Sequence, residues 1–213
     1  MTGIVEKIKG FLFSPSETFD ASKEDTLGDA FKYYLILLLI PALLSAVIAA
    51  VAFSLLAGFF GRMLSFMSAS LAFAGAGAAV VVLIYVLIAG AIGVLIGGLW
   101  LHIWVYLVGG RKGLTQTFKA LMYGATPSLL LGWIPVIGFL ASIWALIVEI
   151  IGIRQLHEIS TGRAVAAVIL AIIIPLVVWL VVWFVILLPA MMPTMPYGHG
   201  ICLLYTSPSP RDS

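Results

Sequence analysis

The chain has 213 residues, of which 63% are hydrophobic and only 9% are charged, and its formal net charge is +2. Globular domains average roughly 25% charged residues, so this composition excludes a soluble core, and so small a net charge gives no reason to expect a nucleic-acid partner. Only eight residues between Tyr33 and Pro189 are charged. Because a charge at mid-bilayer costs roughly 2.5–3.5 kcal/mol, the sequence predicts an all-α, polytopic integral membrane protein in contact with the lipid bilayer.

Residues 1–32 are the most polar part of the chain before its C-terminal tail. The apolar run that follows begins at Tyr33 and, at about 25 residues, is too late and too long for the hydrophobic region of a signal peptide. We expect residues 1–32 to form a cytoplasmic or interfacial amphipathic segment on an anionic leaflet, because apolar residues share one helical face beside Lys7 and Lys9. Asp25 or Thr26 should cap the helix that enters the membrane. The apolar face consists of Ile4, Val5, Ile8, Phe11 and Leu12.

Five apolar runs follow, and a spanning helix needs about 20 residues. The second run, of 40 residues, could be one tilted helix or two. With five helices and a cytoplasmic N-terminus, nine basic residues before position 200 lie inside and only Arg62 lies outside; splitting the second run leaves four inside and six outside. Basic residues favour the cytoplasmic side, so residues 33–190 are predicted to be a five-helix transmembrane bundle. The runs are Tyr33–Phe60, Leu71–Gly110, Leu114–Gly132, Pro135–Ile153 and Ala164–Leu188.

Small residues and a proline indicate how these helices pack. Ala89, Gly93 and Gly97 recur every four residues, which lets two helix backbones approach closely, and we expect them to pack within the chain rather than in a dimer. The third and fourth helices should form a hairpin at Gly132–Pro135, because glycine ends helices and proline begins them. About 15 residues, or roughly 22 Å, remain in the third helix after Lys119, so it either falls short of the far surface or is partly re-entrant.

Polar side chains at membrane depth are the candidate functional residues. Pro127 leaves the Tyr123 carbonyl without its helical hydrogen bond, and the Thr126 hydroxyl, water or a neighbouring helix must replace it. Helix rise places three polar helix faces in the cytoplasmic half of the bundle, where they should meet in one cluster. Glu149 would there be paired with Lys119 or His102, or be protonated. The candidate cluster consists of His102, Lys119, Tyr123, Thr126, Pro127 and Glu149.

The alternative interpretation of these residues is structural, since polar contacts between membrane helices contribute only about 0.6–2 kcal/mol each. One histidine and one carboxylate at depth fall short of the three or four ligands that zinc takes. The sequence contains no nucleophile–base arrangement and no phosphate-binding glycine loop. We therefore expect no catalytic residue, no metal site and no cofactor.

Residues 202–213, with Cys202, follow none of the preceding periodicity. They are typical of a translated sequencing adapter, so we interpret them as a non-native tail and expect the natural sequence to be interrupted near Ile201.

The segment Tyr123-Gly124-Ala125-Thr126-Pro127 resembles the Yip family of membrane proteins. The resemblance extends from about Phe11 to Pro189. It is also carried by His102 before Gly109-Gly110, by Gly132-Trp133-Ile134-Pro135, by Trp144 and by Gly152–Arg163.

The resemblance implies five membrane helices, a cytoplasmic N-terminus and a non-enzymatic role as an adaptor or scaffold in membrane organisation or trafficking. Eukaryotic members interact with Rab-type GTPases, so a membrane-associated protein or small GTPase is the implied partner. This chain lacks their long cytoplasmic N-terminal region and is more similar to compact prokaryotic members, which indicates a prokaryotic cytoplasmic membrane. A small transporter or channel using the polar cluster is the alternative function, and the sequence leaves the oligomeric state open.

Overall fold

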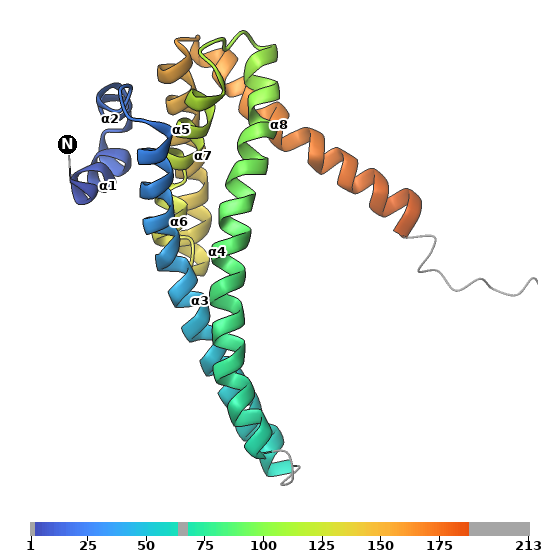
Figure 1. Cartoon of the computed structure of the whole chain (residues 1–213). Helices are drawn as coiled ribbons and strands as arrows, with labels where there is room; N and C mark the ends of the chain where they lie inside the picture. The colour runs from blue at the N-terminus through green and yellow to red at the C-terminus, as the bar shows by residue number, and fades with distance from the viewer. Residues whose placement is uncertain (1–2, 64–67, 188–213) are drawn as a thin grey trace, which may run out of the picture. The chain divides into compact units, whose positions relative to one another are not determined.

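The computed structural model describes residues 3–63 and 68–187, which are helical apart from short turns (Figure 1). The all-α prediction is confirmed over these residues. The predicted tail, residues 202–213, lies outside them. The chain divides into two units, residues 1–172 and 173–213. The described helices are α1 (Ile4–Phe13), α2 (Pro15–Ala21), α3 (Leu27–Met63), α4 (Ser68–Leu107), α5 (Leu114–Gly124), α6 (Thr126–Leu131), α7 (Pro135–His157) and α8 (Thr161–Val182), followed by a π-helical turn at Trp183–Leu187.

The long hairpin of α3 and α4 is the largest feature of the first unit (Figure 1). The two helices have 37 and 40 residues, which makes them about 56 and 60 Å long, against roughly 30 Å for a bilayer core. Because α4 is continuous, the prediction of a single helix for the second apolar run is confirmed. The helices pack closely at Gly90, where an added Cβ would lie 2.7 Å from Leu38 Cδ2. There the Tyr34 hydroxyl donates to the Gly90 carbonyl at 3.1 Å.

The small residues that make close contacts along α4 are not the predicted stripe. Nothing in the described chain lies within 4 Å of a Cβ added at Gly93, and one added at Gly97 would meet only Leu121, at 3.8 Å; Ala89 is exposed. The close contacts occur one residue further along, at Gly90 and Gly98. The physical reason is that α4 is apolar on all sides, so its sequence does not indicate which face is covered.

The third apolar run is two short helices that meet at Ala125, α5 of 11 residues and α6 of 6. Pro127 stands in the first turn of α6, where its missing N–H needs no helical acceptor. Neither helix has the roughly 20 residues that a span needs. In the described chain four helices, α3, α4, α7 and α8, are therefore long and apolar enough to cross a membrane. Five crossings remain a prediction.

The predicted hairpin is present between α6 and α7, and α7 has Pro135 in its first turn. On the same side of the molecule, α5 approaches α7 so closely at Gly124 that an added Cβ would lie 2.9 Å from Glu149 Cα. A side chain at position 124 would therefore force the two backbones apart. The part of α8 that belongs to the first unit is held to α4 by Trp100, whose indole donates to the Ala171 carbonyl at 2.9 Å.

The two N-terminal helices pack against the bundle instead of standing apart from it (Figure 1). Their anchors are Phe11 of α1 and Phe19 of α2, both 0% exposed. At the periphery, the Trp144 indole of α7 donates to the Leu12 carbonyl at 3.2 Å. Residues 3–32 thus form part of the folded first unit; their predicted position on the membrane surface stays a prediction.

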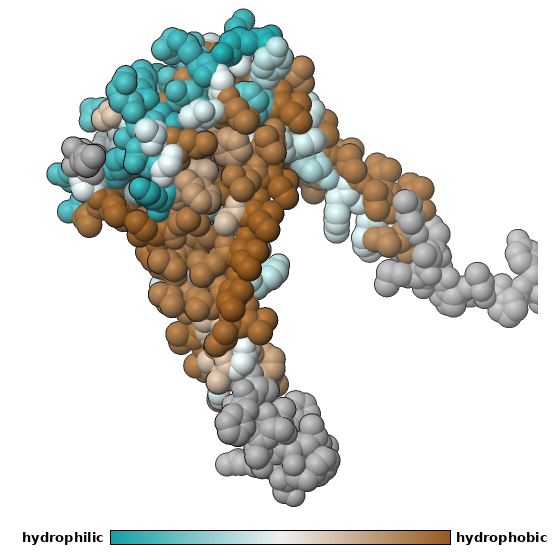
Figure 2. All heavy atoms as spheres, in the orientation of Figure 1, coloured by the Kyte–Doolittle hydropathy of each residue, from teal (hydrophilic) through white to brown (hydrophobic). Residues whose placement is uncertain are grey.

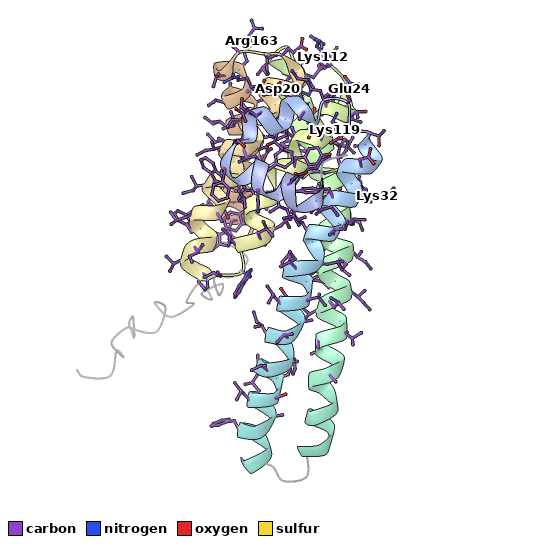
Figure 3. All side chains as sticks on the ribbon, turned by 90° about the vertical axis from the view of Figure 1, so that its left-hand side faces the viewer. Asp20, Glu24, Lys32, Lys112, Lys119 and Arg163 are labelled. Carbon is purple, nitrogen blue, oxygen red and sulfur yellow. The ribbon has the colours of Figure 1, made fainter. Side chains whose placement is uncertain are left out.

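Charged and apolar surfaces separate along the first unit. Hydrophilic residues gather around α1, α2 and the neighbouring helix ends, while the length of the α3–α4 hairpin is covered by apolar side chains (Figure 2). On that hairpin Leu55 is 70% exposed and Ile96 is 63% exposed. The labelled charges Lys32, Lys112 and Arg163 lie at one end in Figure 3, whereas Arg62 belongs to the last turn of α3. So large an exposed apolar surface suits a lipid solvent.

Candidate functional site

An aromatic cluster at the charged end of the first unit surrounds Tyr123, a residue predicted from the sequence. Tyr123 is 0% exposed and lies in the last turn of α5. Its ring stacks on Phe11, with centroids 4.7 Å apart and planes 17° apart. Tyr33 of α3 and Phe19 of α2 present their edges to it at 5.3 and 6.3 Å. Tyr123 therefore joins four helices, since aromatic pairs in these geometries are attractive beyond their buried area.

The Tyr123 hydroxyl connects this aromatic cluster to an ion pair. It donates to Asp25 Oδ2 at 2.6 Å, and Lys7 Nζ lies 2.5 Å from the same oxygen. Burial raises the pKa of Asp25, but the hydrogen bonds from Lys7 and Tyr123 outweigh it, so the pKa lies below its ordinary value of 3.8. Asp25 is free for this role because Thr26 caps α3 by accepting a hydrogen bond from the Asp29 amide at 3.2 Å.

Thr126 and Pro127 follow Tyr123 along the chain, at the beginning of α6, and both are buried. The Thr126 hydroxyl donates to the Tyr123 carbonyl at 2.6 Å, which is one of the three partners expected for that group. The Tyr33 hydroxyl lies 3.0 Å from the same Thr126 oxygen. The Tyr123 carbonyl, which would otherwise be a buried backbone group without a partner, is therefore bound by Thr126 of α6, and Tyr33 of α3 in turn contacts Thr126.

Lys119 is 1% exposed, which is unusual for a lysine. Its ammonium group donates to the Lys23 carbonyl at 2.8 Å, in the turn between α2 and α3. With Lys7, Asp25 and Tyr123 it forms what we call the N-terminal clamp, completed by Phe11 and Phe19. The clamp fixes α1 and α2 to α5, and each of its polar groups has a partner within the protein. Such a set of contacts keeps α1 and α2 in a fixed position against α5.

A second polar group is centred on Thr117 of α5. Its hydroxyl lies 2.8 Å from His102 Nδ1 of α4 and 3.0 Å from His157 Nε2 of α7. His157 is 3% exposed, and its Nδ1 has no partner among the described residues. This group ties three helices together close to the charged end of the first unit.

Glu149 stands in a third environment. It lines a groove of about 350 Å³ between α5, α6 and α7, with Ser128 and Ser142 as the polar residues near it. No hydrogen bond or ion pair reaches its carboxyl group from the described residues. Lys119, one of its two expected partners, binds the Lys23 carbonyl, and the other, His102, binds Thr117.

The single polar cluster expected from helix depth is therefore three separate groups. The structure brings Lys119, Tyr123, Thr126 and Pro127 together, and it places His102 and Glu149 in different contacts. Residue spacing gives the depth of a side chain along its helix, but rotation of the helix decides which neighbour that side chain meets. Whether these residues act in function stays a prediction.

Several residues of these polar groups are not predicted as candidate functional residues from the sequence. The sequence predicts a surface helix for Lys7 and a helix cap for Asp25, and His157 is not among the candidate residues that it indicates. The available signal was the interruption of the α1 apolar face by lysine, since Lys7 lies one turn from Phe11. A lysine on the same face as a buried phenylalanine needs a carboxylate partner, and Asp25 is the acidic residue that supplies it.

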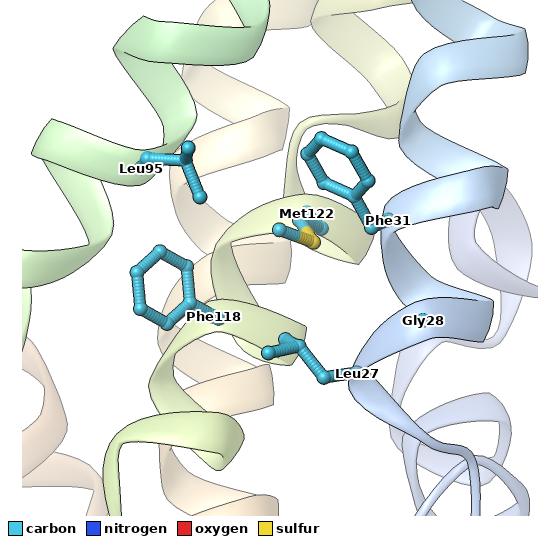
Figure 4. Close-up of a pocket in the computed structure, with 6 residues that line it drawn as sticks. All are labelled: Leu27, Gly28, Phe31, Leu95, Phe118 and Met122. Carbon is cyan, nitrogen blue, oxygen red and sulfur yellow. The ribbon is translucent and has the colours of Figure 1, made fainter.

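An apolar pocket of about 390 Å³ lies on another side of α5 (Figure 4). Its walls come from three helices: Leu27, Gly28 and Phe31 of α3, Leu95 of α4, and Phe118 and Met122 of α5. It offers shape and apolar surface but no charged or hydrogen-bonding side chain, which suits a hydrocarbon chain better than a reacting substrate.

Among residues 3–63 and 68–187, no three His, Cys, Asp or Glu side chains are grouped so that they could hold a metal ion.

Comparison with curated proteins gave no match, and comparison with solved structures gave none either. A family model, that of the Yip1 domain, matches residues 9–192. This range begins within α1 and continues past α8, so it includes the N-terminal clamp except Lys7, the divided third run and the α6–α7 hairpin. The chain is therefore a multi-pass membrane protein that belongs to the Yip1-domain family.

Proposed function

We propose that this protein is a non-enzymatic adaptor of the cytoplasmic membrane that recruits a membrane-associated protein to its charged end. The observation that carries the proposal is the N-terminal clamp. It fixes α1 and α2 to α5. The Lys119 contact with Lys23 and the Lys112 ion pair with Glu158 link residues 3–32, 111–119 and 154–163 into one surface, which we call the charged face. A prearranged surface lowers the entropic cost of binding a partner.

The chemistry of the charged face supports a protein partner. It carries exposed ion pairs such as Lys112 with Glu158, at 2.7 Å, and Lys23 with Asp20, at 2.7 Å. Exposed pairs contribute little to folding and can be exchanged for charges of a partner. The Yip family is linked to Rab-type GTPases, so a small GTPase is a reasonable first class of partner to examine.

The orientation of the chain is part of this proposal. Nine basic residues belong to the charged end and Arg62 to the far end of α3, and the positive-inside rule then makes the N-terminus cytoplasmic. A hairpin of α5–α6 with α7 returns the chain to the side from which it started, whether or not its turn emerges into the opposite compartment. The charge distribution therefore supports the same orientation for five crossings and for a re-entrant hairpin.

The test is affinity capture of the chain from its native membrane in mild detergent, followed by mass spectrometry. Lys112→Glu combined with Arg154→Glu reverses charges on the charged face, and Arg62→Glu is the matched control at the far end. We expect a reproducible partner that the double variant loses and the control keeps. If both variants retain or both lose the same proteins, the charged face is not the binding surface.

The alternative function, a small transporter or channel, needs a connected polar path. The three polar groups of the described chain lie in separate contacts, and no observation favours a path between them. We therefore do not propose transport.

A further inference from the structure

Glu149 is a charged side chain inside the membrane-spanning helix α7, and no other described residue makes a hydrogen bond or ion pair with it. Glu149 lies eight residues before the end of α7, which is about 12 Å along the helix axis. It is partly buried, and among the described residues that line the groove it is the charged one. A carboxylate at such a position needs a compensating charge, because an unpaired ion is costly to desolvate.

The two serines of the groove limit which hydrogen-bonding groups a bound ligand can have. The Ser128 hydroxyl donates to the Ala125 carbonyl at 2.9 Å, and the Ser142 hydroxyl donates to the Gly138 carbonyl at 2.8 Å. Their hydrogens are already used, so both oxygens face a ligand only as acceptors. With the Glu149 carboxylate, the polar atoms that these side chains offer are therefore all acceptors. An occupant must bring hydrogen-bond donors and, to compensate the carboxylate, a positive charge.

The remaining walls are apolar. Leu121, Ala145 and Leu146 line the groove beside Gly124 and Ala125, and its volume is about 350 Å³. Leu146 is 37% exposed, so the groove is open along the face of α7. A small hydrophilic cation would leave these walls uncovered, whereas an alkyl chain next to a cationic group would cover them. We infer that the groove binds an amphiphile with a protonated amine, the ammonium group on Glu149 and the alkyl chain along α7.

The amine could belong to a membrane lipid, such as the ethanolamine headgroup, or to an amphiphile that enters from water. Purified chain in phosphatidylcholine nanodiscs is titrated with dodecylamine and, for comparison, with dodecanol, and binding is measured by native mass spectrometry. We expect the amine to bind roughly tenfold or more tightly than the alcohol, since hydrogen bonds to a charged group are the strong ones. Repeating the titration in nanodiscs containing phosphatidylethanolamine distinguishes the two sources. Weaker dodecylamine binding there identifies the lipid amine as the occupant, and unchanged binding identifies an amine from water.

Two variants test the role of the site. Glu149→Gln should remove the preference for the amine, while Glu24→Gln, which changes an exposed carboxylate in the same way, should keep it. Ser142→Phe fills the groove without touching the carboxylate and should weaken both ligands. Elution as a monodisperse species at the wild-type position verifies that each variant is folded. Equal binding of amine and alcohol to the wild type, no binding of the amine, or a preference that survives in Glu149→Gln would each overturn the inference.

Discussion

The N-terminal clamp can be tested with two phenylalanines of the same helix. Phe11 is 0% exposed and stacks on Tyr123 at 4.7 Å, whereas Phe13, two residues later, is 83% exposed. Truncating a buried phenylalanine to alanine costs about 3–5 kcal/mol, which corresponds to a rise in opening of roughly 10²- to 10³-fold or more. This loss of stability should affect α1 and α2, because helices of 10 and 7 residues are not stable unless they pack against the rest of the protein.

Hydrogen exchange measured by mass spectrometry in detergent follows this opening directly. In Phe11→Ala, the amides of α1 and α2 should exchange faster by the stated factor, while those of α4 keep their protection. Phe13→Ala should leave α1 and α2 at the wild-type rate, because its ring has little protein contact to lose. Equal acceleration in both variants, or in neither, would refute the view that burial of Phe11 against Tyr123 holds the N-terminal helices.

Three further outcomes follow from the same contacts. The pKa of Asp25 is lowered by its hydrogen bonds, so its contribution to docking is fully present above its ordinary value of 3.8 and is lost as pH falls through the lower folded value. Exchange of α1, corrected for the intrinsic rate at each pH, should rise below that pH in the wild type, and this rise should be absent in Asp25→Asn. Gly124→Ala should lower the thermal midpoint in detergent through a strain of about 1–3 kcal/mol, because its methyl group would lie 2.9 Å from Glu149 Cα. Gly93→Ala should leave the midpoint unchanged, because no described atom lies within 4 Å of its methyl group. Equal shifts in the two variants would contradict the packing described. In a chain whose Cys202 is replaced by serine, Trp133→Cys should react with a membrane-impermeant maleimide from outside if the chain crosses five times. Protection from both sides would identify a re-entrant hairpin.

The parts of the fold that the sequence predicted are those set by solvent and chain chemistry. The scarcity of charge between Tyr33 and Pro189 is a direct consequence of the lipid environment, so membrane-spanning helices followed from it. The continuity of α4 followed from where the basic residues could lie. Pro135 marked the beginning of α7 because proline is compatible with the first turn of a helix.

The division of the third run at Ala125 was harder to predict. Pro127 indicated a carbonyl without its helical partner, and the Thr126 hydroxyl does bind that carbonyl. Whether the helix would bend and continue or end and restart depends on what its neighbours supply. Here Tyr33 of α3 supplies a second hydroxyl at 3.0 Å from Thr126, across 93 residues of sequence. A contact of that separation has no local signal.

The rotation of each helix about its axis is what the sequence could not specify, and α4 demonstrates why. In water, the apolar face of a helix identifies its buried side, but in lipid both sides are apolar and the pattern carries no such information. The stripe of Ala89, Gly93 and Gly97 and the contacts at Gly90 and Gly98 differ by one position, or about 100° of rotation. Only the shapes of Leu38 and Phe118, which pack onto Gly90 and Gly98, select the second arrangement. The same indeterminacy explains why polar residues expected at similar depths were predicted to form one cluster: spacing along a helix gives an expected depth, but side-chain packing decides the neighbours.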